Sequence, residues 1–362
     1  MYLESIKLIN FRNFKDAEIE ASSGINIIYG QNGSGKTSLL ESAYYLSLAR
    51  SFRTNRALYI VNEDAKSFTL FSKVIDDNGH GHKLGIERDA QGTINIRYDG
   101  NNLSRISELA QNLCVQFIAP ENLSLLDDGP GERRAFLDWG GFYHFPNFCS
   151  CFNEFKAILK QRNALLTQKA DSSYLDFWDR QFIEINEKLN AFRNEYITLF
   201  NKEVAPIIER FLPNYKISIE LAPGFRVGDL ASQLKDALAR EYVLGYTVYG
   251  AHKADLKFKA NGRLASEVLS RGQSKLLVIA LKIAQGMIFS RCCNKSCVFL
   301  IDDITSELDP EKVKLLFSFI ESLADKHQFF ISCLDEKLFN DFGTHHNSYK
   351  IIDNEILGIK EK

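Results

Sequence analysis

The chain lacks a strong net charge, a long apolar run and a targeting segment. Its 362 residues carry 44 Lys and Arg against 46 Asp and Glu, a formal net charge of −2. Such a chain has no strong global field for polyanions, so any nucleic-acid binding depends on local basic patches. We find no apolar run long enough to span a membrane, and the start, Met1–Glu4, has no signal-peptide pattern. We therefore expect a cytoplasmic protein with no membrane partner.

A regular cysteine pattern is also missing. The seven cysteines are odd in number and irregularly spaced. Neither Cys149 with Cys151 nor the group Cys292, Cys293 and Cys297 gives the paired CxxC spacing that is typical of zinc sites. We interpret these residues as free thiols in a reducing cytosol.

What the chain does have is a phosphate-binding loop. Residues 30–37 read GQNGSGKT and match the pattern GxxxxGK[ST]. The apolar run Ile25–Tyr29 predicts a strand before this loop, and Ser38–Leu46 predicts a helix after it. The alternative is a glycine-rich turn that matches the pattern by chance, and such a turn would not require a strand before it and a helix after it. The glycines let backbone N–H groups face phosphate oxygens, and the start of the helix adds a favourable dipole. We predict that Lys36 contacts the β and γ phosphates of a nucleoside triphosphate and that Thr37 offers a hydroxyl to Mg²⁺.

A second apolar strand, Val298–Ile301, ends in two carboxylates. Asp302 stands where a carboxylate can hold Mg²⁺ directly or through water, although a carboxylate that only caps the strand end is the alternative. Asp303 follows, where a carboxylate can orient or deprotonate the attacking water. We predict Asp303 and Lys36 as the catalytic residues.

A second anion site is predicted at residues 269–273, which read LSRGQ and open a predicted helix over Gln273–Phe289. Ser270 is a good N-cap, Gly272 permits close approach, and the first turn presents free N–H groups. Because the chain already has a complete phosphate loop, we predict that this site completes the pocket of a second copy across a twofold axis. A capped helix without a ligand is the alternative. The predicted contacts with the partner's nucleotide are Ser270, Arg271, Gly272, Gln273, Ser306 and Asp309.

The chain changes character along its length. Residues 56–100 contain strand patterns and turn signals, whereas residues 131–211 are helical in pattern, with no heptad repeat long enough for an extended coiled coil. Strand-like segments return near Lys216 and over Tyr246–Phe258. From Ser270 on, helices and strands alternate, which is typical of an α/β fold with a largely parallel sheet. We predict an ATPase head over 1–115 and 246–362 with an inserted, mainly helical lobe over 116–245.

These motifs in this order resemble those of ABC-type ATPases. The loop lysine and the helix-opening serine are 270 − 36 = 234 residues apart, more than in transporter domains, and the extended coiled coil of SMC-type proteins is missing. The compact helical insertion is similar to that of the RecF family of bacterial recombination mediators. The resemblance covers nearly the whole chain and rests on residues 10–14, 30–41, 51–53, 119–123, 133–138, 160–163, 250–256, 270–273, 302–303 and 306–309.

The resemblance implies an ABC-type ATPase head that uses ATP and Mg²⁺, forms a dimer on ATP, and binds duplex DNA near single-strand gaps or junctions. It also implies RecO-type and RecR-type partners that help load a recombinase, with roles in gap repair, replication-fork restart and the SOS response. A slow ATPase is expected, because ABC ATPases usually have Glu where this chain has Asp303. The implied ATP contacts are Arg12, Gly30, Gln31, Asn32, Gly33, Ser34, Gly35, Lys36, Thr37 and Ser38.

Departures from the family occur at Ala251 and Lys253, where Pro and Arg are usual, and Lys253 loses any bidentate contact. His327 is predicted at the surface. By the resemblance, Gln116 is a candidate for the Mg²⁺-linked glutamine of ABC proteins, and Ser332 is a candidate for sensing the γ-phosphate.

DNA contacts are predicted from cations alone, since sequence-independent binding to phosphates needs only positive charges on a shared face. Acidic residues are interspersed, so an ordinary solvated surface is an equally good interpretation of each cation. Two other functions stay open: an ABC-type regulator of a protein partner, and an SMC-like nuclease subunit, which would need an extra metal-binding cluster. The candidate DNA contacts are Arg53, Arg56, Lys156, Lys160, Arg162 and Lys169.

Overall fold

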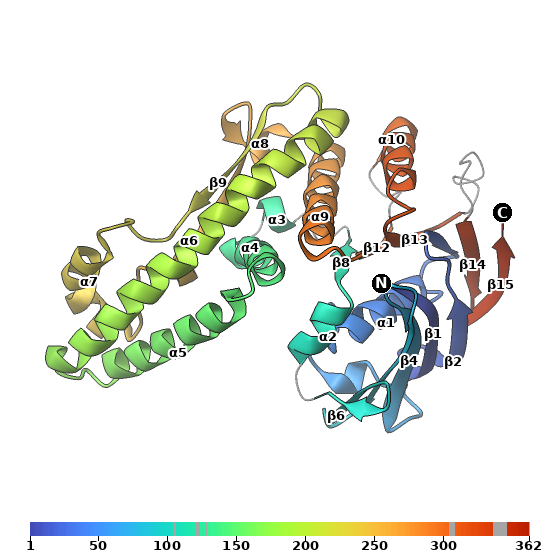
Figure 1. The fold of residues 1–362 in the computed structure, drawn as a ribbon, viewed down its shortest axis with the longest axis horizontal. Helices are drawn as coiled ribbons and strands as arrows, with labels where there is room; N and C mark the ends of the chain where they lie inside the picture. The colour runs from blue at the N-terminus through green and yellow to red at the C-terminus, as the bar shows by residue number, and fades with distance from the viewer. Residues whose placement is uncertain (104–105, 120–123, 128, 304–307, 336–345, 362) are drawn as a thin grey trace. The chain divides into compact units, whose positions relative to one another are not determined.

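The computed structural model describes the chain except residues 104–105, 120–123, 128, 304–307, 336–345 and 362. The chain forms two compact units, one of residues 1–122 with 275–362 and one of residues 123–274 (Figure 1). In these units residues 116–122 lie with the first unit and residues 246–274 with the second, whereas the sequence assigned 116–245 to the inserted lobe. The reason is strand pairing, because β10 (Asp255–Ala260) pairs with β9 (Ile217–Ala222) inside the second unit.

The first unit contains an antiparallel sheet of six strands in the order β2-β1-β4-β5-β6-β7. The predicted turns fall between its strands, since Asp76 accepts from His80 N and Asp99 lies in the left-handed region at φ 48°. The strands are β1 (Tyr2–Phe11), β2 (Phe14–Glu20), β4 (Ser67–Ile75), β5 (Gly81–Asp89), β6 (Ile94–Tyr98) and β7 (Asn101–Asn102).

A second sheet of six strands follows the order β15-β14-β3-β13-β12-β8. All its pairings are parallel except that of β14 with β15. Every residue of β12 and β13 is buried, as expected for parallel strands covered on both faces. The strands are β3 (Ile25–Tyr29), β8 (Val115–Ile118), β12 (Val298–Ile301), β13 (Gln328–Cys333), β14 (His346–Ile352) and β15 (Glu355–Glu361).

The helix α1 (Lys36–Leu48) contacts strands of both sheets. Its core side chains, such as Leu39 and Leu40, have no exposed surface, so the helix is fixed in the centre of the unit. The unit also contains α2 (Ile106–Asn112), α10 (Pro310–Glu321) and the short η1 (Ala57–Tyr59).

The helix α9 (Arg271–Cys293) begins at the end of the second unit and continues into the first. Contrary to the expectation from sequence, it is long and apolar enough by length and composition to cross a membrane. However, 72% of its most apolar window is buried inside the structure. Its hydropathy is therefore explained by packing in the core.

The second unit is mainly helical, as predicted over 131–211, and it is not an extended coiled coil. The long helix α6 packs against α4, α5 and α7 and against β9. Gly140 allows the closest approach, since a Cβ there would lie 1.9 Å from the Tyr196 ring. The helices are α3 (Ser124–Asp127), α4 (Pro130–His144), α5 (Phe148–Thr167), α6 (Ser172–Phe211), α7 (Leu230–Leu244) and α8 (Ala265–Val268).

A three-stranded antiparallel sheet, in the order β11-β10-β9, completes this unit. The predicted strand over Tyr246–Phe258 is wrong for its first part, because Ala251–Lys253 forms a 3₁₀ turn, η3, and β10 begins only at Asp255. The short β11 (Arg263–Leu264) leads into α8 and then into α9.

Candidate nucleotide site

The loop at 30–37 follows β3 and leads into α1, as predicted. Gly35, the N-cap of α1, lies in the left-handed region with φ 117°. An added Cβ would lie 2.8 Å from the Phe14 ring and 2.8 Å from Asn13 Nδ2. Glycine is therefore required here both by the backbone conformation and by the neighbouring β1–β2 turn.

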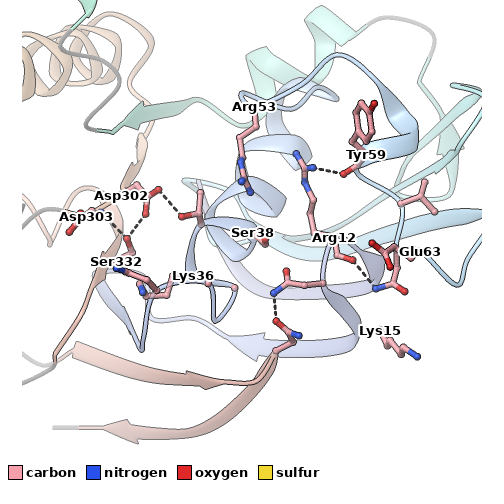
Figure 2. Close-up of a pocket in the computed structure, with 18 of the residues that line it drawn as sticks. Arg12, Lys15, Lys36, Ser38, Arg53, Tyr59, Glu63, Asp302, Asp303 and Ser332 are labelled. Atoms are coloured by element: carbon pink, nitrogen blue, oxygen red, sulfur yellow. Dashed lines mark hydrogen bonds between the residues drawn. The ribbon is translucent and has the colours of Figure 1, made fainter.

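A pocket of about 890 Å³ opens beside this loop within the first unit (Figure 2). Asp302, Asp303 and Ser332 form one part of its wall, and Arg12, Tyr59 and Glu63 form another. The predicted contacts Gly30, Gln31 and Ser34 do not line it, and Ser34 is 9% exposed. The lining residues from the loop and helix are Asn32, Gly33, Gly35, Lys36, Thr37 and Ser38.

Lys36 is held across the loop by the loop's own carbonyl groups. Its Nζ donates to Gly30 O at 2.7 Å and to Gln31 O at 2.8 Å. Burial lowers the pKa of Lys36, and the nearby Asp302 opposes this shift. The loop therefore fixes a partly desolvated ammonium in the pocket, where its attraction for phosphate is stronger than in water.

Thr37 and Asp302 meet in the pocket although they are 265 residues apart in the chain. Thr37 Oγ1 donates to Asp302 Oδ2 at 2.9 Å, and Ser332 Oγ donates to Asp302 Oδ1 at 2.5 Å. A hydroxyl and a carboxylate side by side at a phosphate loop are the hard oxygen ligands that Mg²⁺ prefers. The residues present therefore fit the predicted magnesium ion.

Asp303 lies at the pocket wall with its backbone in the left-handed region, at φ 46°. Its N–H donates to Ser332 Oγ at 2.8 Å. Ser332, a weak candidate from sequence, thus contacts both consecutive aspartates (Figure 2).

A buried carboxylate behind the pocket was missed by sequence reasoning. Glu41, on α1, has no exposed surface and binds Arg12 through two hydrogen bonds of 2.9 and 2.6 Å. Ser51 Oγ also donates to Glu41, and an Arg53 nitrogen lies 3.9 Å from it. The signal that could have found it is its place on the buried face of the predicted helix.

The element at 270–273 forms a reciprocal cap at the start of α9. Ser270 N donates to Gln273 Oε1 at 2.9 Å, and Gln273 N donates to Ser270 Oγ at 3.4 Å, the pattern of a capping box. Ser270 and Arg271 are exposed, and Gly272 is buried. The predicted N-cap is confirmed, and solvent reaches the start of the helix at Ser270 and Arg271.

The other predicted contacts with a partner's nucleotide are only partly described. Asp309 is exposed and caps α10 by accepting from Lys312 N at 2.9 Å. Ser306 lies outside the described residues. Gln116 is 2% exposed and donates to Gln285 Oε1 at 3.3 Å, away from the pocket lining.

His327 is not at the surface, contrary to prediction. It is 3% exposed, and its Nδ1 accepts from Cys297 N at 3.2 Å. Burial lowers its pKa to about 4. The ring fills the space before β13 and packs edge-on against Phe299.

The prediction that Arg162 contacts DNA is wrong. This side chain has no exposed surface and pairs with Asp179 and Glu241, each at 2.7 Å. Arg53 is half exposed but lines the nucleotide pocket. The remaining candidates, Arg56, Lys156, Lys160 and Lys169, are exposed.

Comparison with known proteins agrees with this geometry. A family model described as the RecF/RecN/SMC N-terminal domain matches residues 2–355. The chain is 39% identical over 337 residues to the DNA replication and repair protein RecF of Shewanella piezotolerans, covering 92% of each chain. It is 41% identical over 317 residues to the RecF of Shewanella denitrificans, covering 87% of this chain and 88% of the relative.

Solved structures show the same likeness. A structure of the recombination mediator protein RecF with ATP, of the RecFOR pathway, superposes with a TM-score of 0.86 at 25% identity and covers 100% of this chain and 97% of the other. An SMC head bound to the C-winged helix domain of ScpA superposes with a TM-score of 0.65 at 14% identity, covering 100% and 98%, and shows the fold alone. The predicted ABC-type ATPase head with a helical insertion is thereby confirmed.

Proposed function

Because the chain belongs to the RecF family of DNA replication and repair proteins, we propose that it is an ATP-gated DNA-binding protein of recombinational gap repair. ATP would join two copies, the dimer would bind duplex DNA near single-strand gaps or junctions, and RecO-type and RecR-type partners would follow. We place this work in the bacterial cytoplasm at the nucleoid.

One observation carries the ATP part of this proposal. The loop lysine, the loop threonine and the carboxylate at the end of β12 line one pocket of about 890 Å³, with Thr37 Oγ1 only 2.9 Å from Asp302. A solved relative, which is 25% identical, is described as RecF with ATP. This volume is ample for a nucleoside triphosphate and falls within the usual range of ligand pockets.

The pocket residues have distinct tasks in this proposal. The loop N–H groups and Lys36 bind and orient the phosphates. Thr37 and Asp302 would hold Mg²⁺, which when bound neutralises phosphate charge. Asp303 lines the same pocket, where its carboxylate orients the attacking water and accepts its proton. Arg12, fixed by Glu41, presents its guanidinium from the opposite wall.

Hydrolysis is proposed to be slow, because an Asp side chain is one methylene shorter than the Glu that is usual at the second carboxylate. We expect a turnover below about 1 s⁻¹, the low end of the range for enzymes. A steady-state ATPase assay with and without DNA measures it, and a turnover typical of metabolic enzymes would contradict this part.

Dimer formation is proposed from the exposed cap of α9. Ser270 and the N–H groups behind it make an anion site at a helix start in a chain that has its phosphate loop elsewhere. We expect Ser270→Arg to abolish ATP-driven dimerisation while leaving ATP affinity unchanged, because the new side chain would fill the partner's nucleotide site. Light scattering with and without ATP tests this. A Ser270→Arg protein that still forms ATP-dependent dimers would rule out the twofold arrangement in which each copy completes the other's pocket.

DNA binding is proposed through exposed cations. Arg56, Lys156, Lys160 and Lys169 are the candidates that remain, because Arg162 is buried and Arg53 lines the nucleotide pocket. Lys156 also lies over the Phe152 ring at 4.4 Å, which limits its freedom and lowers the entropy lost on binding a phosphate.

A regulator of a protein partner is the second candidate, and the near-neutral charge of the chain favours it. The nuclease alternative gains no support, since the part of the chain that the structure describes contains no group of three His, Cys, Asp or Glu side chains that could hold a metal ion.

A further inference from the structure

The peptide of Asp303 is held at both ends by side chains from other elements. Its N–H donates to Ser332 Oγ at 2.8 Å, and its C=O accepts from Lys275 Nζ at 2.9 Å. Ser332 lies at the end of β13 and Lys275 on α9. All three residues belong to the first unit.

Asp303 has a left-handed backbone conformation, which aspartate adopts more readily than most non-glycine residues but still less easily than glycine. At φ 46° Asp303 is in the left-handed region, which a non-glycine residue adopts only at an energetic cost. Strain of this kind persists only where surrounding groups fix the backbone. Two charged or polar side chains, both nearly buried, supply that fixation, since Ser332 is 0% and Lys275 is 4% exposed.

We propose that Ser332 and Lys275 are positioning residues that clamp the Asp303 peptide in its left-handed conformation and so aim the Asp303 carboxylate at the attacking water. The proposal rests on the proposed ATPase function and deepens it. Neither residue is proposed to touch the attacking water or the phosphate. They act through Asp303.

The hydroxyl of Ser332 does two things at once. It accepts from Asp303 N–H and donates to Asp302 Oδ1 at 2.5 Å, so both capacities of this hydroxyl are used. The strand β13 lies between β3 and β12 in the sheet. One serine therefore ties the two aspartates that follow β12 to β13, the strand beside the phosphate-loop strand β3.

Lys275 connects the same peptide to the helix whose first turn is the proposed anion site for a partner's nucleotide. Lys275, on α9, lies 275 − 270 = 5 residues after the capping residue Ser270, which corresponds to about 1.4 helical turns. A displacement of the start of α9 is thereby passed to the C=O of Asp303. This link gives a physical route by which a second copy can adjust the catalytic carboxylate.

The test compares Ser332→Ala and Lys275→Met with the wild type and with Ser47→Ala. Ser47 is a matched control, since it is a buried serine whose Oγ donates to Leu113 O at 2.5 Å, outside the pocket lining. In single-turnover assays we expect the rate constant of ATP hydrolysis to fall about 10- to 100-fold in the two clamp variants, because small misplacement of a reacting group costs up to about 10²-fold in rate. In Lys275→Met, whose side chain does not line the pocket, affinity for a fluorescent ATP analogue should change less than about threefold, and the control should behave as wild type.

A thermal double-mutant cycle tests the clamp without any activity readout. Asp303→Gly removes the strain, because glycine adopts positive φ freely. Ser332→Ala removes two hydrogen bonds and should lower Tm by about 4–8 °C in the Asp303→Gly background. In the wild-type background it should lower Tm by clearly less, because the released Asp303 peptide relaxes out of its left-handed conformation. If Ser332→Ala does not fold, the isosteric Ser332→Cys, which weakens both hydrogen bonds, replaces it.

Equal losses of Tm from Ser332→Ala in the two backgrounds would overturn the clamp. A single-turnover rate constant equal to that of the wild type in both clamp variants would overturn it as well. A wild-type protein that does not hydrolyse ATP at all would instead sink the proposed function, while the thermal cycle would still decide whether the Asp303 peptide is clamped.

Discussion

The nucleotide pocket of the first unit and the helical core of the second unit use charged side chains in opposite ways. In the first unit, Lys36, Asp302 and Asp303 line an open pocket of about 890 Å³. In the second unit, arginines are withdrawn into the core and paired there. Arg162 pairs with Asp179 and Glu241, and Arg193 is 2% exposed and pairs with Asp138 at 2.7 Å.

The difference teaches where a charged residue is informative. In the first unit, charges follow directly after strands, so the sheet itself brings them to one edge and leaves them open to a ligand. In the second unit, charges are distributed along helices, where the face of the helix decides whether a cation meets solvent or the core. The residues adjacent in sequence therefore predict the function of a charge that follows a strand. They do not predict it for a charge on a helix, where the face of the helix decides.

The largest expected effect breaks the buried pairing of the second unit. Arg162→Met leaves Glu241, which has no exposed surface, as an unpaired buried charge, and we expect a loss of about 3–5 kcal/mol in the free energy of unfolding. Urea denaturation measures the loss. Lys160→Met, one exposed position two residues earlier, is the control and should stay within about 0.5 kcal/mol.

A companion variant sharpens this result. Arg162→Met with Glu241→Met replaces both buried charges and should regain most of the lost stability. Failure of the double variant to recover would mean that Arg162 stabilises the unit through packing or through its bond to Thr247 rather than through charge pairing.

The next largest effect is on the open charges of the first unit. Lys36→Met should lower ATP turnover about 10²- to 10³-fold, the loss typical of removing one preorganised group that stabilises developing charge, with little change in unfolding free energy. Steady-state ATPase assays and urea denaturation on the same preparation separate the two quantities. If Lys36→Met instead caused a large loss in the free energy of unfolding and left turnover per folded molecule normal, Lys36 would be a structural charge like the buried arginines of the second unit.

Sequence predicted the pocket well because its parts obey fixed local spacing. The loop, the strand before it and the carboxylates after β12 each depend on a few adjacent residues. The strands β8 and β14 were not predicted, because their pairing with β12 and β3 is decided by contacts far away in the chain. The strand β15 was also missed, although it pairs locally with β14.

The error at Arg162 had a signal in the sequence. Phe155, Ile158 and Leu166 on α5 are buried and recur at helical spacing, and Arg162 falls on the same stripe, whereas Lys156 and Lys160 fall off it. His327 gave no such signal, because its burial depends on the neighbouring segment before β12, which no local pattern specifies.

Acid should destabilise both units through buried histidines. Burial lowers the pKa of His327 in the first unit and of His252 in the second unit to about 4. Both values lie below the unfolded value of about 6.5, so this stability is fully present above pH 6.5 and is lost as the pH falls toward 4. At pH 5 the expected loss is about 2 kcal/mol for each histidine.

Urea denaturation at pH 7.5 and pH 5 measures this loss in the wild type and in His327→Gln. The variant should lose about 2 kcal/mol less than the wild type between the two pH values, since it lacks one of the two titrating groups. An identical pH dependence would show that His327 is protonated in the folded protein.

The smallest expected effect concerns the exposed cations of the second unit. If Lys160 contacts a DNA phosphate, Lys160→Gln should reduce the slope of log K against log salt by about 0.9. Fluorescence anisotropy with labelled duplex over a salt series measures the slope. Glu154, an exposed residue on the same helix, offers the matched control Glu154→Gln, which should not reduce the slope.

The most direct measurement is binding of the purified protein to gapped duplex DNA at one fixed, moderate salt concentration, with and without ATP and Mg²⁺. We predict that binding depends on ATP and that Lys36→Met weakens it. Binding that is indifferent to nucleotide, or no binding under either condition, would contradict the account of an ATP-gated DNA-binding protein.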